Sequence, residues 1–162
     1  MKCVQFYKGE IPNKKNCWLY QMIKWSNFTL EADHDYIQWM FPSNEPSQMV
    51  ADSPVLTKEE SEIFQSDISL QEKVKTSFRR FLNFLDFELV NEEIKPMKDV
   101  PSWIAAESLH NMMRITRMFK SLRLTGNEEY AKLFFKSLKP YRDKVSSNTW
   151  NYWENAVEGE LR

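Results

Sequence analysis

Apolar side chains recur three and four residues apart along most of the chain, and this spacing predicts helices. The clearest case follows Ser69, where large apolar residues return every turn as far as Leu89 with lysines and arginines between them. No stretch alternates apolar and polar residues for long enough to predict a strand. We therefore expect an all-α fold of about seven helices, at residues 17–26, between Asp33 and Pro42, from Thr57, from Ser69, and at 103–124, 127–139 and 147–158.

Residues that start and stop helices support these boundaries. Asp33 stands where the N-cap of the second helix is expected, and Pro42 ends that helix because proline lacks an amide donor and clashes with the preceding turn. The segments 57–60 and 69–72 both have the Ser/Thr-x-x-Glu form of a capping box, so each predicts a helix start. Gly126 is expected to close the long helix at 103–124.

The composition fits a single compact domain at residues 1–162. The chain is 42% hydrophobic, which is enough at this length to bury a core without a metal ion or disulfide bonds. The proline-rich segment 42–54 is short for a linker, so we interpret it as an ordered loop rather than a domain boundary. Only three glycines occur, which leaves little chain for phosphate-cradling loops, and we expect no cofactor.

The charge balance excludes partners that a strong global field would attract. There are 22 basic and 23 acidic residues, giving a net charge of −1, so general nucleic-acid binding is not expected. No run approaches the roughly 20 apolar residues that a membrane span needs. Cys3 and Cys17 follow no secretory signal pattern, and we expect reduced thiols inside the cell, in the cytoplasm or, in a eukaryote, also in the nucleus.

A polar stripe on the helix expected at 103–124 is the main candidate for chemistry. At about 100° per residue, His110, Arg114, Arg117 and Ser121 fall within an arc of roughly 60°. Arginine presents paired donors that match a carboxylate or a phosphate, and an imidazole one turn away could donate or accept a proton. The stripe could therefore bind an anion.

An internal role for the same arginines is the alternative. Helices that are packed on most sides often use arginine to pair with carboxylates of neighbouring segments, and Glu31, Asp33 and Asp35 are the candidates here. The cluster would then hold the second helix against the long one, and removing one partner would leave an unpaired buried charge at a cost of about 3 to 5 kcal/mol. The sequence leaves both alternatives open.

Other chemistry finds less support. The consecutive residues 33–35 diverge by about 100° each on a helix and do not converge on one metal ion, so we favour a capping Asp33 and an exposed His34. With two histidines and no nucleophile motif, neither a metal site nor covalent catalysis is expected. A general acid–base role for His110 beside Glu107 is the remaining route to an enzyme.

Tyr36 and Trp39 allow two interpretations. In a short helix beside a proline-rich loop, such aromatic side chains most often belong to the core. In a ligand pocket they would instead stack on an aromatic ring, while Arg114 and Arg117 held a carboxylate or phosphate. Such a pocket would suit either a peptide or a nucleotide.

Three blocks of sequence stand out: Phe-Tyr-Lys-Gly-Glu-Ile-Pro at 6–12, Asp-Tyr-Ile-Gln-Trp-Met-Phe-Pro at 35–42 followed by Glu-Pro-Ser at 45–47, and His-Asn-Met-Met-Arg-Ile-Thr-Arg at 110–117. In order and approximate spacing they resemble the conserved domain of the opioid growth factor receptor family. The resemblance covers most of the chain. It departs from the family at Leu109, where the family often has serine.

The resemblance implies a binding role. Members of this family are known as intracellular and perinuclear receptors of the pentapeptide methionine enkephalin, and animal members carry further repetitive tails. We therefore expect a non-catalytic module that recognises a peptide or protein, with a small anionic, nucleotide-like ligand as the alternative and an enzyme using His110 as the third hypothesis. The oligomeric state stays open. The candidate ligand-binding residues are Asp33, His34, Tyr36, Trp39, His110, Asn111, Arg114 and Arg117.

Overall fold

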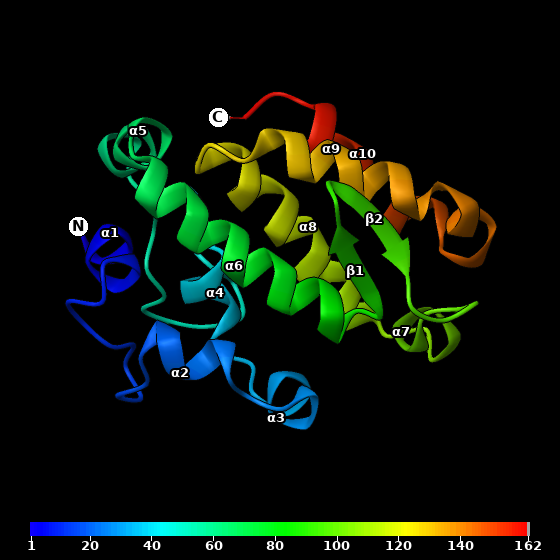
Figure 1. The fold of residues 1–162 in the computed structure, drawn as a ribbon, viewed down its shortest axis with the longest axis horizontal. Coiled ribbons are helices and arrows are strands. Elements are labelled where there is room, and N and C mark those ends of the chain that lie inside the picture. The colour runs from blue at the N-terminus through cyan, green and yellow to red at the C-terminus, as the bar shows by residue number, and fades with distance from the viewer. Residues whose placement is uncertain (162) are drawn as a thin grey trace.

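Two long helices, α6 (Ile68–Phe84) and α8 (Leu109–Leu124), run through the middle of the molecule, and the shorter elements surround them (Figure 1). The structure is a computed structural model that describes residues 1–161. Over these residues the chain forms ten α-helices, one 3-10 helix and one β-hairpin. The other elements are α1 (Lys2–Tyr7), α2 (Leu19–Ile23), α3 (Asn27–Ala32), α4 (Ile37–Met40), α5 (Lys58–Ser66), β1 (Phe87–Val90), β2 (Glu93–Pro96), α7 (Ser102–Ala105), α9 (Glu128–Leu138), η1 (Lys139–Lys144) and α10 (Ser147–Glu158).

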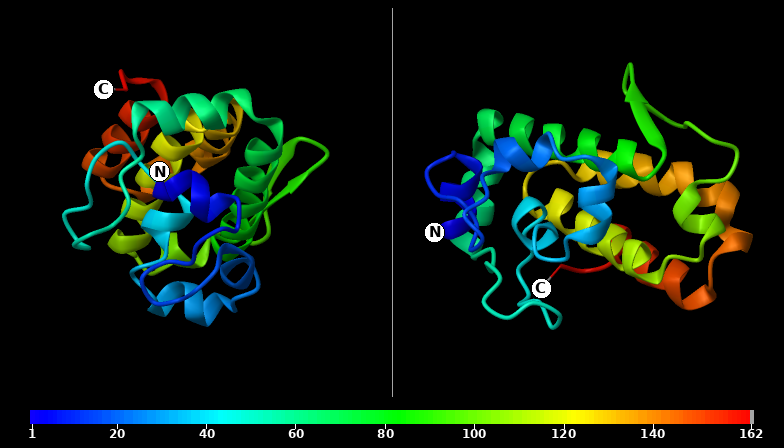
Figure 2. Two further views of the ribbon diagram at one scale, coloured as in Figure 1. Left: turned by 90° about the vertical axis from the view of Figure 1, so that its left-hand side faces the viewer. Right: turned by 90° about the horizontal axis from the view of Figure 1, so that it is seen from below.

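The helices divide into two groups around one hydrophobic core. The short helices α1 to α4 lie on one side of the long pair, and α9 and α10 pack on α8 and on each other on the other side (Figures 1 and 2). The fold is therefore predominantly helical, as the hydrophobic spacing predicts. Bulky side chains fill the core, and the largest fully buried ones include Trp153, Tyr7, Tyr36, Phe6, Phe41, Phe64 and Phe78.

Capping side chains fix the starts of α5 and α6. At α5 the predicted capping box is confirmed, since the Thr57 hydroxyl accepts from the Glu60 amide at 3.1 Å and the Glu60 carboxylate accepts from the Thr57 amide at 3.3 Å. At α6 the predicted box is wrong, because the helix begins earlier. Its N-cap is Asp67, whose carboxylate accepts from the Leu70 amide at 3.2 Å, and Ser69 lies within the first turn.

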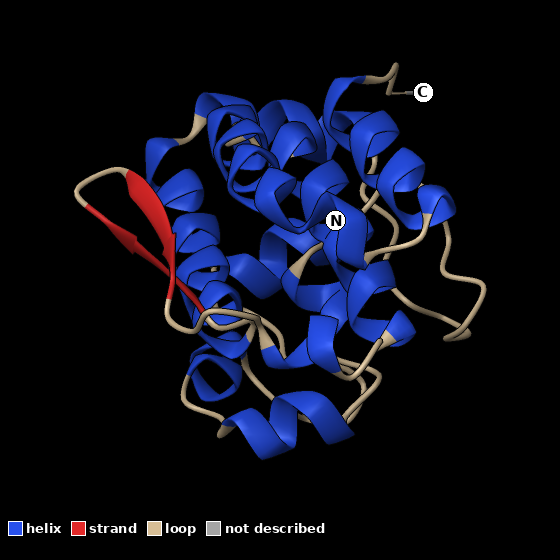
Figure 3. Ribbon diagram, turned by 90° about the vertical axis from the view of Figure 1, so that its right-hand side faces the viewer, coloured by secondary structure: helices blue, strands red, loops and turns tan. Residues whose placement is uncertain are grey.

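The expectation of no strand is also wrong, because residues 87–96 form an antiparallel hairpin at the edge of the molecule (Figure 3). Val90 pairs with Glu93, which leaves Asn91 and Glu92 as a two-residue turn. Both turn residues have positive φ, 51° and 62°, as the type I′ turn of a tight hairpin requires.

Helical spacing of apolar residues hides this hairpin in the sequence. Leu85 and Leu89 continue the apolar stripe of α6, although the helix ends at Phe84. Asp86 has a φ of 67°, a left-handed conformation that interrupts the helix. Phe87 and Leu89 then form the buried face of β1, because alternate side chains of a strand point the same way.

Two unexpected helices, α1 and α3, and a break in one expected helix raise the helix count above seven. The helix expected at 17–26 corresponds to α2 alone, α3 begins beyond it at Asn27, and Asp33 is the C-cap of α3 rather than the N-cap of the next helix. The helix expected at 103–124 is divided into α7 and α8, with Glu107 between them at a φ of 51°. Helix α1 has no counterpart in the expected set.

The remaining boundaries agree with the sequence. Helix α4 ends before Pro42, and Gly126, at a φ of 89°, follows the end of α8. Helices α9 and α10 occupy the segments expected at 127–139 and 147–158. None of the described helices combines the length and the apolar character that crossing a membrane requires.

Replacing Asp67 by alanine removes the N-cap of α6 and is expected to lower the free energy of unfolding by about 0.5–2 kcal/mol. The matched control is Ser69→Ala, which alters an exposed residue of the first turn and should change that free energy by less than about 0.5 kcal/mol. Urea unfolding measures both values. A larger loss in Ser69→Ala than in Asp67→Ala would contradict the observed helix start.

Candidate functional site

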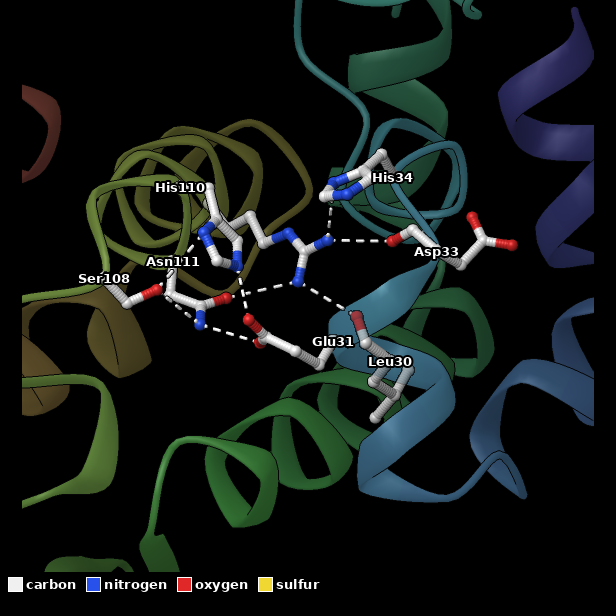
Figure 4. A network of polar contacts seen from close by, with 8 residues as sticks. Leu30, Glu31, Asp33, His34, Ser108, His110 and Asn111 are labelled. Carbon is white, nitrogen blue, oxygen red and sulfur yellow. Dashed lines mark hydrogen bonds and ion pairs between the residues drawn. The ribbon is translucent and has the colours of Figure 1, made fainter. Parts of the chain in front are cut away.

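A network of polar contacts joins the end of α3 to the start of α8 (Figure 4). At its centre the Arg114 guanidinium donates from Nη1 to the backbone oxygen of Leu30 at 2.9 Å and from Nη2 to that of Asp33 at 2.8 Å. Nη1 also donates to Asn111 Oδ1 at 3.2 Å, and Nη2 lies 3.5 Å from His34 Nδ1. One side chain thus closes the C-terminal end of α3.

Burial of the Arg114 guanidinium strengthens its contacts with these backbone oxygens. Arg114 has only 6% of its surface exposed, and its guanidinium lies 5.3 Å from the centre of the Tyr36 ring. Carbonyls at the C-terminal end of a helix lack an intrahelical donor and carry partial negative charge, so a cation there is favourable. The guanidinium and the carbonyls therefore satisfy one another, whereas either alone would be costly inside the protein.

The arginines contact backbone carbonyls rather than the expected carboxylates, which corrects the internal alternative in part. The Asp33 carboxylate points away from the network in Figure 4 and accepts from the Asp35 amide at 2.8 Å. The Asp35 carboxylate pairs with Lys15 at 2.5 Å. The predicted role of holding two segments together still applies to Arg114, because it fastens the segment at the end of α3 to α8.

Glu31 is the carboxylate of the network, and His110 and Asn111 bind it. Its Oε1 lies 2.6 Å from His110 Nε2, and its Oε2 accepts from Asn111 Nδ2 at 2.9 Å. Burial acts to raise the pKa of Glu31, but the hydrogen bond from Asn111 and the charges of His110 and Arg114 lower it below its ordinary value. The side chains of Glu31 and His110 are about half exposed, at 46% and 45%, so this pair forms the solvent-facing edge of the network.

Arg117 binds the end of the next helix, α4. Its Nε donates to the backbone oxygen of Phe41, the C-cap of α4, at 2.9 Å. Its Nη2 is buried and has no hydrogen-bond partner among the described residues. Burial lowers the pKa of Arg117 to about 10, which still leaves the side chain protonated at neutral pH.

The same kind of contact recurs at other helix ends. Helix ends leave carbonyls without donors, and long cationic side chains of α6 and α8 reach them in or just after the last turn of α1, α2 and α10. These contacts run from Lys73 Nζ to Tyr7 at 3.1 Å, from Arg80 Nη2 to Trp25 at 2.8 Å and from Arg123 Nη1 to Ala156 at 2.9 Å.

Tyr36 and Trp39 lie in the core, the first of the two interpretations that the sequence allowed. Tyr36 is fully buried, and its ring stands edge-on to Trp25 with the ring centres 5.6 Å apart. Trp39 is 6% exposed and packs against Phe6 at 5.2 Å. In this structure both rings support the segment that carries the network.

An open pocket of about 470 Å³ lies on the outer side of the turn between α3 and α4. Phe28 stands at its side with 82% of its surface exposed, and nothing in the sequence marks it, because an apolar residue in a helix is usually buried. Asp33 and His34 are the predicted site residues that reach both this pocket and the network. The pocket is lined by Lys15, Phe28, Thr29, Ala32, Asp33, His34 and Asp35.

Several catalytic or metal arrangements lack the necessary geometry. Across residues 1–161, no three His, Cys, Asp or Glu side chains gather as a metal site requires. Burial raises the pKa of the Cys3 thiol to about 12, which makes it a poor nucleophile. Glu107 lies outside α8, and the His110 ring contacts Ser108 and Glu31.

These features define a small, predominantly helical domain in which Arg114 and Arg117 fasten segments of the chain together beside an open pocket. The model of the opioid growth factor receptor conserved region matches residues 1–160. The chain therefore belongs to the opioid growth factor receptor family, as the resemblance predicted.

Curated relatives carry the same family name. The chain is 34% identical over 136 residues to the opioid growth factor receptor of Mus musculus, 32% to that of Homo sapiens and 30% to the opioid growth factor receptor-like protein 1 of Rattus norvegicus. Each match covers 78% of this chain but only 21%, 20% and 29% of the relative, so the chain spans less than a third of these proteins. No solved structure matches it.

Replacing Arg114 by alanine is expected to lower the free energy of unfolding by about 2–4 kcal/mol, because the carbonyls of Leu30 and Asp33 lose a charged donor inside the protein. The control is Arg79→Ala, which removes an exposed arginine from α6 and should cost less than about 0.5 kcal/mol. Urea unfolding measures both. Equal losses in the two variants would contradict a specific role for Arg114.

Acid should weaken the contact of Glu31 with α8. Because its pKa is lowered in the folded protein, Glu31 stabilises the fold above its unfolded pKa of about 4.3, and this contribution is lost as the pH falls through the folded value. The loss is expected to stay below about 1 kcal/mol, since the pair is half exposed.

Denaturant unfolding between about pH 7 and pH 3 tests this expectation. Glu31→Gln should remove the contribution of Glu31 to the loss of stability in acid. Glu88→Gln, at an exposed position of β1, should keep the wild-type dependence. A Glu31→Gln variant with the full wild-type dependence would show that Glu31 does not stabilise the fold through its charge.

Proposed function

We propose that this domain is a non-catalytic binding module that recognises a peptide or protein through the face formed by α3, the turn before α4 and the start of α8. The proposal rests on the pocket of about 470 Å³ that Phe28 helps to line, a residue with 82% of its surface exposed to solvent. A large ring held in the open among charged and polar groups is typical of a surface that buries the ring against a partner.

The network beneath the pocket supports this role. The backbone of α3 is tied through Leu30 and Asp33 to the buried guanidinium of Arg114. A surface that is held in place before binding loses less conformational freedom on binding, and this favours affinity. Glu31 and His110 form a half-exposed polar pair that joins α3 to α8 in the same network.

The arginine pair offers less to a small anionic ligand. Both terminal nitrogens of Arg114 already contact groups of the protein, and the side chain is buried. Arg117 is engaged with the end of α4. A nucleotide would have to displace these contacts, whereas a peptide can use the exposed face. The name of the relatives as receptors also fits a ligand-binding role.

We also propose that the protein acts inside the cell. Both cysteines, Cys3 and Cys17, are free thiols, the state that reducing compartments maintain. The receptor family that the chain resembles is known from such a location.

A random peptide library displayed on phage is expected to yield peptides that bind the immobilised protein. Methionine enkephalin, the ligand that the family resemblance implies, is tested beside them. Synthetic copies of the selected peptides should shift the amide resonances of residues 27–35 and 108–113 in ¹⁵N spectra. Phe28→Ala should weaken their binding at least about tenfold, since burying a phenylalanine ring contributes about 1.5–3 kcal/mol.

The matched control is Ile68→Ala, which truncates another exposed apolar side chain, 76% exposed, at the start of α6. This variant should bind the selected peptides as the wild type does. The proposal fails if no peptide is enriched, or if the enriched peptides bind Phe28→Ala as tightly as the wild type.

A further inference from the structure

The arginine stripe predicted a positively charged site for an anion, but carboxylates predominate among the charged groups at the open pocket. Its charged and aromatic lining consists of Asp33, Asp35, Lys15, the Phe28 ring and the His34 imidazole, whereas Arg114 is buried and does not line it. Lys15 is itself paired with Asp35. An incoming group therefore meets carboxylates and an aromatic ring before any arginine.

Lys15 shows that the pocket can hold an alkylammonium group. Its Nζ lies 2.5 Å from Asp35 Oδ2. The hydrogen bond to Asp35 and the charge of the nearby Asp33 raise the pKa of Lys15 above its ordinary value. The contact joins two segments, because Lys15 lies in the loop before α2 and Asp35 lies in the turn before α4.

The loop around Lys15 is ordered by a buried side chain. Asn13 is 6% exposed, and its Oδ1 accepts from the amide of Lys15 at 3.0 Å and from the amide of Cys17 at 2.9 Å. This turn sets the direction in which the lysine leaves the backbone. The protein thus presents its own ammonium group to the pocket from a fixed position.

We propose that this pocket binds a basic group of the partner, an alkylammonium or a guanidinium, and that Lys15 occupies the same carboxylates in the free protein as an internal competitor. The inference rests on the proposed function and adds the chemical class of the ligand. Asp35 and Asp33 supply the charge, and Phe28 offers a ring face to the cation. On binding, the partner's group takes the place of Lys15 at Asp35.

Lys15 competes weakly and reversibly for Asp35, because both side chains remain in contact with water. The side chains of Lys15 and Asp35 are 59% and 38% exposed. An exposed charge pair changes an affinity by a factor of up to about five, and a cation beside an aromatic ring adds a factor of similar size. We expect a charge preference of about tenfold that declines with added salt.

Two peptides that differ at one residue test this preference. One is N-acetylated and C-amidated Gly-Tyr-Lys-Gly, and the other has the neutral residue norleucine in place of lysine. Titrations of the ¹⁵N-labelled protein follow the amides of residues 28–35. The lysine peptide should bind about five- to tenfold more tightly. A third peptide, with norleucine and a free N-terminus, shows whether a terminal ammonium group binds as tightly as a lysine side chain.

Variants of the protein then separate the attraction of Asp35 for the peptide's lysine from the competition by Lys15. Asp35→Asn should reduce the preference for the lysine peptide by about fivefold, and Lys15→Ala should strengthen its binding by about two- to fivefold. The matched controls are Asp52→Asn and Lys14→Ala, which break an exposed pair of 2.7 Å outside the pocket lining. Both controls should bind the lysine peptide as the wild type does.

Each outcome has a distinct meaning. Equal binding of the lysine and norleucine peptides at residues 28–35 overturns the cationic class and leaves the peptide-binding surface standing. Unchanged or weaker binding of the lysine peptide by Lys15→Ala overturns the competitor role. If no charged peptide moves these amides, the inference fails. Phage-selected peptides then decide whether the proposed function fails with it.

Discussion

The contact between cationic side chains and the free carbonyls at helix ends is what the rest of this structure depends on. Helices α1 to α4 have only four to six residues each, too few to be stable on their own. A carbonyl at or just after the end of each helix receives a donor from one of the two long helices, in chain order from Lys73, Arg80, Arg114 and Arg117. The N-terminal region therefore takes its order from α6 and α8 rather than from its own helix propensity.

This use of the arginines decides what the surface can bind. A guanidinium that already serves two backbone oxygens, as Arg114 does, is a poor receptor for an external anion. Its contacts fix the turn after α3, and the groups that line the open pocket there include Phe28, His34 and Asp35. Asp33 and His34 both contact Arg114 and line the pocket, so they connect the network that holds the fold to the surface proposed to meet a partner.

Local and periodic features could be read from the sequence, and tertiary partners could not. The Thr57 capping box and the end of α4 before Pro42 need only nearby residues, and both were predicted. The hairpin was missed because Leu85 and Leu89 keep helical spacing across its start. The helical wheel places Arg114 correctly with His110 on α8. It cannot identify the acceptors, because backbone carbonyls have no signature in the sequence.

Hydrogen exchange at the backbone amides of Leu30 and Asp33 is the measurement that tests the central claim most directly. Both amides are hydrogen-bonded within or at the end of α3, whose C-terminal carbonyls Arg114 holds. In Arg114→Met they should exchange about ten- to a hundredfold faster than in the wild type, as the loss of hydrogen bonds from a charged donor implies. In Arg79→Met they should exchange at the wild-type rate. Wild-type rates in Arg114→Met would contradict the dependence of α3 on this contact.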